Sequence, residues 1–111
     1  MIEGVSPPRI ELVFYQTVAG NVPVRDWLLG LPPANRREIG QDLQRVQFRW
    51  PIGKGLFEVR TSLTDGTIAR VLFCFQGGEL YAVHGFIKKS QKTPASDLAL
   101  ARKRQKEIED G

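Results

Sequence analysis

The sequence predicts one α+β domain in which helices pack on one face of an antiparallel sheet. Two observations predict it: four apolar stretches rich in β-branched and aromatic residues have the length of strands, and three other stretches carry apolar residues at helical spacing. A chain of 111 residues has room for a single core, which gives one domain over residues 1–111. The predicted element order is β-α-α-β-β-β-α, and residues 1–8 are expected to form a flexible N-terminal tail.

The first half of the chain is predicted to hold a strand and two helices. The strand covers residues 9–15, where RIELVFY follows a Ser-Pro-Pro breaker. The first helix is indicated by apolar residues spaced i, i+3, i+4 and i+7, and it ends before Pro32-Pro33. The second helix lies within residues 33–48 and has a similar apolar stripe. The two apolar faces comprise Val24, Trp27, Leu28 and Leu31, and then Ile39, Leu43 and Val46.

The second half is predicted as an antiparallel meander followed by a helix. A loop at residues 51–54 leads into strands at 55–61, 67–75 and 80–86. Turns containing Asp65-Gly66 and Gly77-Gly78 join these strands as hairpins. The last helix is expected to start at Thr93-Pro94, with the threonine hydroxyl as N-cap and the proline at the first helical position.

Side-chain alternation along the strands predicts where the charged residues lie. Arg60 faces the opposite way from Phe57 and Val59, and Arg70 faces the opposite way from Val71. With helices on the apolar face alone, both arginines are expected on the open face of the sheet, beside lysines at the ends of two strands. Six cations are therefore predicted to converge, namely Lys54, Arg60, Arg70, Lys88, Lys89 and Lys92.

Composition and charge narrow the function classes. The net charge is +4, and between Arg36 and Lys92 ten Lys or Arg face five Asp or Glu, which suits a nucleic-acid or acidic protein partner. A solvated basic surface explains the composition equally well. No apolar run approaches the ~18 residues of a membrane span, and the N-terminus lacks a signal-peptide pattern, so a cytoplasmic location is expected. The lone Cys74 is expected to be a buried thiol, and no metal-ligand spacing, Cys/His cluster or P-loop is present.

Three segments carry a resemblance to a known family. They are GKGLFEVR at 53–60, IARVLFCF at 68–75 and HGFIKKSQKTP at 84–94, in that order. Together they resemble the HigB-like, phage-derived branch of the RelE/ParE toxin superfamily, and HGFIKKSQKTP is the most specific of the three. The resemblance spans most of the chain and implies a RelE-like fold.

The resemblance also implies a function, that of the toxin of a type II toxin–antitoxin pair. Such toxins are endoribonucleases that need no metal or cofactor. They enter the ribosomal A site, lie against mRNA and rRNA, and cut the mRNA with its own 2′-hydroxyl as nucleophile, which stops translation and growth. A cognate antitoxin, expected to be a helix-turn-helix protein, neutralises the toxin, and operator DNA is contacted only through that complex. No membrane role is implied.

By position, the resemblance assigns roles to the basic residues. Arg60 matches the arginine that holds the scissile phosphate, Lys54 matches the basic residue before that strand, and Arg70 matches an arginine on the third strand. Lys88 or Lys89 stands where these toxins place a basic residue after the last strand. The chain lacks the C-terminal tyrosine of RelE, because no tyrosine follows Tyr81.

The chemistry of RNA cleavage favours specific assignments. The 2′-hydroxyl must lose a proton, the phosphorane must be stabilised, and the leaving 5′-oxygen must gain a proton. Arg60 suits the second task, because a guanidinium forks onto two phosphate oxygens. Neighbouring cations lower the pKa of an ammonium group, so Lys54 is expected as base and Lys89 as acid, and these two roles can be exchanged. Arg70, Lys88 and Lys92 are expected to hold the RNA.

Two points remain open at the level of sequence. His84, the only histidine, is an alternative base, although a histidine within a strand is more often structural. The function has alternatives as well: a non-catalytic toxin that inhibits DNA gyrase, as in the ParE branch, or a decayed toxin that persists as a nucleic-acid-binding module. The crowded cations favour the nuclease, because a phosphate chain needs them and a protein partner does not.

Overall fold

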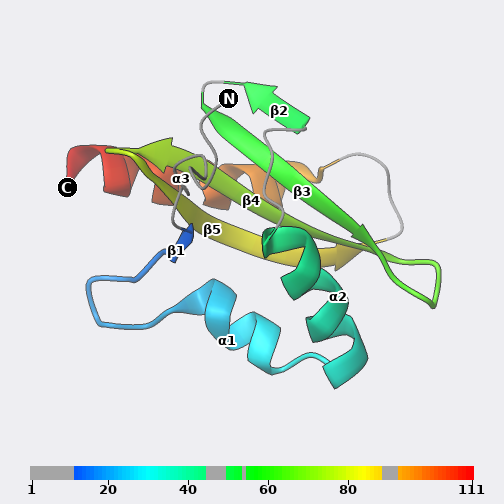
Figure 1. Cartoon of the computed structure of the whole chain (residues 1–111). Helices are drawn as coiled ribbons and strands as arrows, with labels where there is room; N and C mark the ends of the chain where they lie inside the picture. Colours follow the sequence, from blue (N-terminus) through cyan, green and yellow to red (C-terminus); the bar gives the residue numbers. More distant parts are fainter. Residues whose placement is uncertain (1–11, 45–49, 54, 89–92) are drawn as a thin grey trace, which may run out of the picture.

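The computed structural model describes residues 12–44, 50–53, 55–88 and 93–111, and the predicted tail at residues 1–8 lies outside them. The described part contains three helices and five strands (Figure 1). In chain order they are β1 (Leu12–Phe14), α1 (Pro23–Leu29), α2 (Pro33–Gln44), β2 (Trp50–Gly53), β3 (Leu56–Ser62), β4 (Ile68–Gln76), β5 (Glu79–Lys88) and α3 (Ala95–Asp110). The α+β class is confirmed, with one strand more than expected.

The additional strand, β2, occupies a segment predicted as a loop. It pairs antiparallel with β3, with Trp50 opposite Glu58 and Pro51 opposite Phe57, and the register shifts between Pro51 and Gly53. β2 lies at the edge of the sheet, where a proline is tolerated because one side of the strand has no ladder to complete. Pro51 is therefore compatible with an edge strand, and the prediction of a loop from this proline is wrong.

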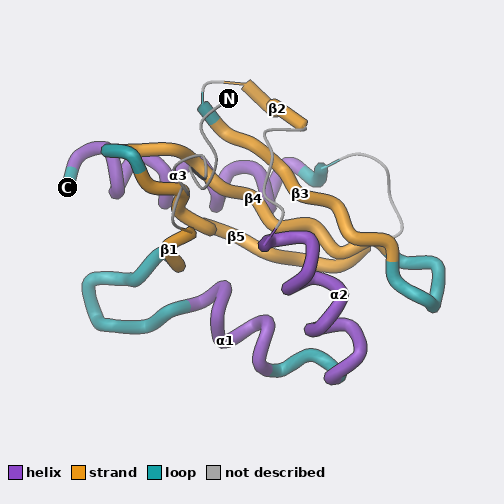
Figure 2. The backbone as a smooth tube through the Cα atoms, viewed as in Figure 1, coloured by secondary structure: helices purple, strands orange, loops and turns teal. Residues whose placement is uncertain are grey.

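The five strands form one sheet in the order β1-β5-β4-β3-β2 (Figure 2). The predicted meander is confirmed, because β3, β4 and β5 pair antiparallel with their neighbours. The all-antiparallel prediction is wrong at one edge, where β1 pairs parallel with β5. No hairpin joins β1 to β5, so no tight turn imposes an antiparallel direction on that pair.

Both predicted hairpin turns are present. Gly77 and Gly78 have φ of 60° and 84°, the positive values that a tight turn between β4 and β5 requires and that glycine adopts without strain. In the turn between β3 and β4, the Asp65 carboxylate accepts a hydrogen bond of 3.0 Å from the Thr67 backbone N–H. These turns set the register of the central three strands.

Helices cover both faces of the sheet, which corrects the expectation of helices on one face. In Figure 1, α1 and α2 lie in front of the sheet and α3 lies behind it. Between the sheet and α1 and α2 lies a cluster that includes Val24, Leu28, Ile39, Leu43, Ala69 and Val71. The second cluster lies against α3 and includes Tyr15, Leu56, Leu72, Cys74, Val83 and Ala101. β4 carries buried apolar residues on both of its faces, and their burial requires a helix on each side.

The last helix begins one residue later than predicted. Pro94 is the N-cap residue, with φ of −60° and ψ of 147°, and no side chain caps the helix. The Thr93 hydroxyl therefore does not act as the N-cap. It donates instead a hydrogen bond of 2.8 Å to Oε2 of Glu58 on β3.

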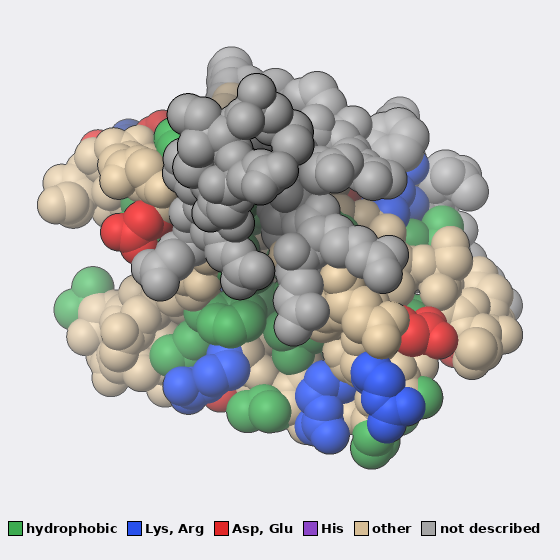
Figure 3. All heavy atoms as spheres, viewed as in Figure 1, with side chains coloured by type: hydrophobic (Ala, Val, Ile, Leu, Met, Phe, Trp, Pro, Cys, Tyr) green, Lys and Arg blue, Asp and Glu red, His purple; other side chains and the backbone are tan. Residues whose placement is uncertain are grey.

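The outer surface of α1 and α2 is basic and polar. Figure 3 shows Lys and Arg side chains along the lower edge of this view, over the two helices. The arginines of these helices are Arg25, Arg36 and Arg37. Across the described ranges, no helix has both the length and the apolar character needed to span a membrane.

Candidate functional site

Strand register gathers the polar residues of the sheet on the face covered by α3, called here the α3 face. Glu58 of β3 pairs with Leu72 of β4, which pairs with His84 of β5. In the next row Arg60 lies opposite Arg70. Neighbouring strands are about 4.8 Å apart, so these side chains form one patch near the start of α3.

Glu58 lies at the centre of this patch and is 1% exposed. Its Oε1 accepts a hydrogen bond from Nε of Arg60 and lies 3.8 Å from Nη1 of Arg70. Its Oε2 accepts the hydrogen bond from Thr93. A buried carboxylate needs such partners, because an unpaired charge in an apolar surrounding is costly.

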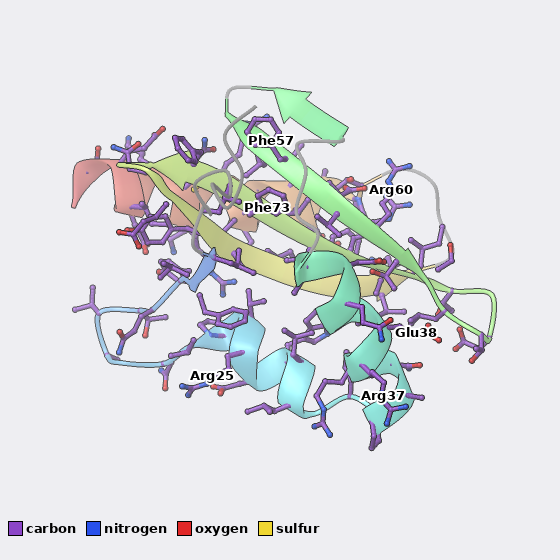
Figure 4. The ribbon with its side chains drawn as sticks, viewed as in Figure 1. Arg25, Arg37, Glu38, Phe57, Arg60 and Phe73 are labelled. Carbon is purple, nitrogen blue, oxygen red and sulfur yellow. The ribbon has the colours of Figure 1, made fainter. Side chains whose placement is uncertain are left out.

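The two arginines beside Glu58 differ in exposure. The side chain of Arg60 is 32% exposed, whereas that of Arg70 is 0% exposed. Figure 4 shows Arg60 beyond β3, on the side away from α1 and α2. Both arginines were expected on an open face, and that expectation is wrong because α3 packs there. Arg60 keeps access to solvent near the end of β3, and Arg70 does not.

A second carboxylate, Asp97, joins the first turn of α3 to β5. Nε2 of His84 lies 2.7 Å from Oδ1 of Asp97, and Nζ of Lys88 lies 3.7 Å from Oδ2. The imidazole also stacks on Phe86, with ring centroids 5.5 Å apart. An acidic residue in the first turn of a helix is favoured by the helix dipole, so Asp97 is well placed to pair with the Lys88 ammonium group and to accept a hydrogen bond from His84.

The predicted site residues have three different outcomes. Arg60, His84 and Lys88 lie on the α3 face and keep partial exposure, with Lys88 47% exposed. Arg70 lies among them but is fully buried, so its guanidinium contacts Glu58 and not solvent. The remaining three residues, Lys54, Lys89 and Lys92, lie outside the described part of the chain.

The polar residues described above form one cluster, which comprises Glu58, Arg60, Arg70, His84, Lys88, Thr93 and Asp97. Sequence reasoning missed three of its members. Glu58 could have been found, because alternation along β3 places it on the same face as Arg60. Thr93 was interpreted as a helix cap, the usual role of a threonine before a helix. Asp97 gave no signal as a partner of His84, because only the packing of α3 on the sheet brings the two together.

The described residues contain no metal-binding constellation. No three His, Cys, Asp or Glu side chains among them lie close enough to hold one ion. The two carboxylates of the cluster are instead paired with cationic or hydroxyl groups. The partly exposed groups of the cluster are the guanidinium of Arg60, the ammonium group of Lys88 and the imidazole of His84.

Two further ionisable residues on the α3 face lie within the core. The Tyr15 hydroxyl donates to Glu107, and this hydrogen bond, together with burial, raises the pKa of Tyr15 above 10.0. Arg104 lies over the Tyr15 ring and donates to the backbone oxygen of Val83 at 2.7 Å. Burial is the main cause that raises the pKa of the Cys74 thiol to about 11. These groups support packing, and a thiol with such a pKa is inert near neutral pH.

Comparison with known proteins gives one family match. Residues 26–106 match the sequence model of the family described as "Phage derived protein Gp49-like (DUF891)", and this range contains all seven described residues of the cluster. No curated protein matches the chain significantly. The family is of the toxin–antitoxin toxin type, similar to RelE and HigB. The match covers well over half of the chain, and the protein therefore belongs to the Gp49-like family of phage-derived proteins.

Proposed function

We propose that this protein is the toxin of a type II toxin–antitoxin pair and a metal-independent endoribonuclease that cleaves mRNA on the translating ribosome. One observation carries the proposal: strand register gathers Arg60, Lys88 and His84 on the α3 face, each with partial exposure. Two cations for phosphate and one group for proton transfer are the equipment that RNA cleavage requires. The toxin type of the family supports the same function.

Arg60 is the proposed phosphate clamp. Its Nε donates a hydrogen bond to Glu58, and its side chain reaches solvent. A permanently charged, planar donor group stabilises the extra negative charge that develops on the phosphorane. Arg70, buried behind it, supplies a second positive charge to Glu58 and is proposed to support the clamp rather than to touch RNA.

His84 is the described residue best suited to accept the proton of the 2′-hydroxyl. The Asp97 carboxylate only accepts hydrogen bonds, so Nε2 of His84 carries the hydrogen of the 2.7 Å contact. In the neutral imidazole this leaves the lone pair on Nδ1. Lys54 and Lys89, outside the described residues, remain proposed as base and acid, with His84 as the alternative base, and Lys88 and Lys92 as contacts to the RNA backbone.

The partners follow from the proposed function. The substrate is mRNA in the ribosomal A site, next to rRNA, in the cytoplasm. A cognate antitoxin with a helix-turn-helix domain is proposed to neutralise the toxin and to carry it to operator DNA. Loss of toxicity when this antitoxin is expressed together with the toxin tests the pairing.

Arg60→Ala is the test of the nuclease. We expect the variant to fold, because Glu58 keeps Arg70 and Thr93 as partners. Removal of the clamp should lower ribosome-dependent mRNA cleavage by about 10²-fold or more and abolish growth arrest. Cleavage is followed by mapping mRNA 5′ ends after induction, and the fold is checked by circular dichroism.

The matched control is Arg25→Ala, which removes an exposed arginine from α1, far from the cluster in sequence and on the opposite side of the sheet. This variant should cleave mRNA at the rate of the unmodified protein. Full toxicity and full cleavage in Arg60→Ala would contradict the assignment of the phosphate clamp.

A second function is favoured by the charge balance of the cluster. Glu58 and Asp97 lie within ion-pair distance of Arg60, Arg70 and Lys88, and each carboxylate weakens the attraction of these described cations for phosphate. This balance suits a non-catalytic toxin that inhibits DNA gyrase, or a module that binds RNA without cutting it. Cleaved mRNA without DNA-break signalling supports the nuclease, DNA breaks without cleaved mRNA support gyrase inhibition, and salt-sensitive RNA binding alone supports the module.

A further inference from the structure

Glu58 is an unusual residue for its position. Two of its neighbours on the α3 face, Leu56 and Leu72, are fully buried and apolar, as expected beneath a helix. A buried ion pair contributes little net stability, and an apolar replacement of similar volume is often neutral or stabilising. Packing alone therefore does not account for a carboxylate at this position.

The Thr93 hydroxyl donates a hydrogen bond to Glu58 and does not cap the helix that follows. A threonine just before a helix ordinarily caps the free backbone N–H groups of the first turn. Here Pro94 is the N-cap residue and the helix has no side-chain cap. The Thr93 hydroxyl donates instead to Oε2 of Glu58 at 2.8 Å.

The two oxygens of Glu58 are used for different purposes. Oε2 is held by Thr93, and Oε1 accepts from Nε of Arg60. Because a carboxylate is planar, a hydrogen bond that fixes one oxygen also fixes the direction of the other. Arg70 lies within 3.8 Å of Oε1 and gives Glu58 a counter-charge that does not depend on Arg60.

We propose that Glu58 and Thr93 act together as positioning residues for Arg60: Thr93 orients the buried carboxylate, and the carboxylate orients the guanidinium toward a phosphate. This inference rests on the proposed nuclease function and extends it to two residues that do not touch the substrate. Arg60 then presents its Nη groups in one orientation without reorganisation during the reaction.

Thr93→Val is the sharpest test, because valine keeps the shape of threonine and removes only the hydroxyl. Glu58 is less suitable, since its removal takes away the carboxylate that lies 3.8 Å from the buried Arg70. We expect Thr93→Val to lower kcat for mRNA cleavage about tenfold and to change KM less than about twofold, because the variant loses one hydrogen bond to a charged group. Thr93→Ser restores the hydroxyl and should recover kcat.

A second readout follows the position of Arg60 without any cleavage. The Arg60 Nε–H signal in a nuclear magnetic resonance spectrum should exchange slowly with water in the unmodified protein and in Thr93→Ser, and at least fivefold faster in Thr93→Val. The matched control is Thr17→Val, which removes a hydroxyl that accepts the Asn21 backbone N–H in the loop after β1. That variant should leave both kcat and the Arg60 exchange rate unchanged.

The outcomes separate the inference from the function on which it rests. If the unmodified protein cleaves no mRNA, the proposed function is wrong. The positioning role of Glu58 and Thr93 is then tested by the Arg60 exchange rate alone. Normal kcat with normal Arg60 exchange in Thr93→Val overturns the inference. A loss of activity that matches a loss of thermal stability and is not recovered by Thr93→Ser also overturns it, because the role of Thr93 is then structural.

Discussion

Arg60 and Arg70 are the same residue type, lie on the same sheet face and are directly opposed in the β3–β4 ladder. Two like charges in such a pair destabilise a sheet, and Glu58 offsets this repulsion by contacting both. The environment then separates their roles, because Arg60 reaches solvent and Arg70 is enclosed. A buried guanidinium cannot bind a phosphate chain, so of these two arginines only Arg60 is proposed as the phosphate clamp.

Removal of Glu58 should be costly for stability. In Glu58→Ala, Arg70 remains buried and loses the Glu58 carboxylate, and breaking a buried ion pair in this way typically costs about 3 kcal/mol or more. We expect the free energy of unfolding, measured by urea denaturation, to fall by about that amount. The control Glu38→Ala, on α2 and labelled in Figure 4, should change it by less than about 0.5 kcal/mol. A loss below about 1 kcal/mol in Glu58→Ala would mean that the pair is not structurally important.

At the scale of elements, β5 is the strand that serves both faces of the sheet. His84 lies on the α3 face, and the next residue, Gly85, lies opposite Val71 on the face covered by α1. Trp27 of α1 packs directly over Gly85, where an added Cβ would overlap Cζ3 and Cε3 of the indole. The close approach of α1 therefore explains why residue 85 is a glycine. His84, beside it, belongs to the candidate site through its contact with Asp97.

Gly85→Ala should move α1 or the Trp27 side chain and destabilise the protein. Overpacking of this kind costs about 1–3 kcal/mol, seen as a lower midpoint in thermal or urea unfolding. Gly40→Ala on α2 is the matched control, because its Cβ meets nothing within 4 Å. Alanine at that helical position should stabilise the protein by about 0.5–1 kcal/mol. Equal effects of the two substitutions would show that the contact with Trp27 is not close in solution.

At the scale of the whole molecule, α3 closes a core to which distant parts of the chain contribute. Tyr15 follows β1, Cys74 lies on β4, and both are buried against α3. The Tyr15 hydroxyl donates a hydrogen bond to Glu107 of α3, which connects the end of the first described strand to the last helix. Both residues hold their protons more tightly in the folded protein than in the unfolded chain, which makes stability depend on alkaline pH.

The free energy of unfolding should fall as the pH rises from about 9 to about 11. In this range the unfolded chain loses the Cys74 proton, whereas burial raises the pKa of the folded thiol from 9.0 to about 11. Tyr15, whose pKa is raised mainly by its hydrogen bond to Glu107, adds a loss in the same direction above pH 10. Below about pH 8 both groups are largely protonated in both states and add little slope.

Urea unfolding at a series of pH values measures this dependence. Cys74→Ala should be somewhat less stable at neutral pH but should show a shallower decline between pH 9 and 11. Tyr15→Phe should keep the part of the decline that belongs to Cys74. Identical slopes in the unmodified protein and both variants would refute the assignment to these two groups.

Prediction from sequence succeeded where local signals were strong. The meander, its two glycine turns and the helices α1 and α2 follow from alternation, turn residues and helical spacing. β2 was missed because Pro51 marks a loop by local rules and is tolerated here only at a sheet edge. The parallel pairing of β1 with β5 was missed because residues far apart in sequence make it, and no local pattern encodes such a contact.

The amino-acid sequence by itself determined the α+β class, the alternation that puts Glu58, Arg60 and Arg70 on one face, and the resemblance that the family match supports. These are local properties of a strand or of a short motif. Only the tertiary structure decided that α3 covers that face, that Arg70 is buried, and that Thr93 and Asp97 bond to Glu58 and His84. The physical reason is burial: the apolar residues on both faces of β4 must both leave water, and the helix that covers the second face brings its own polar residues to the site.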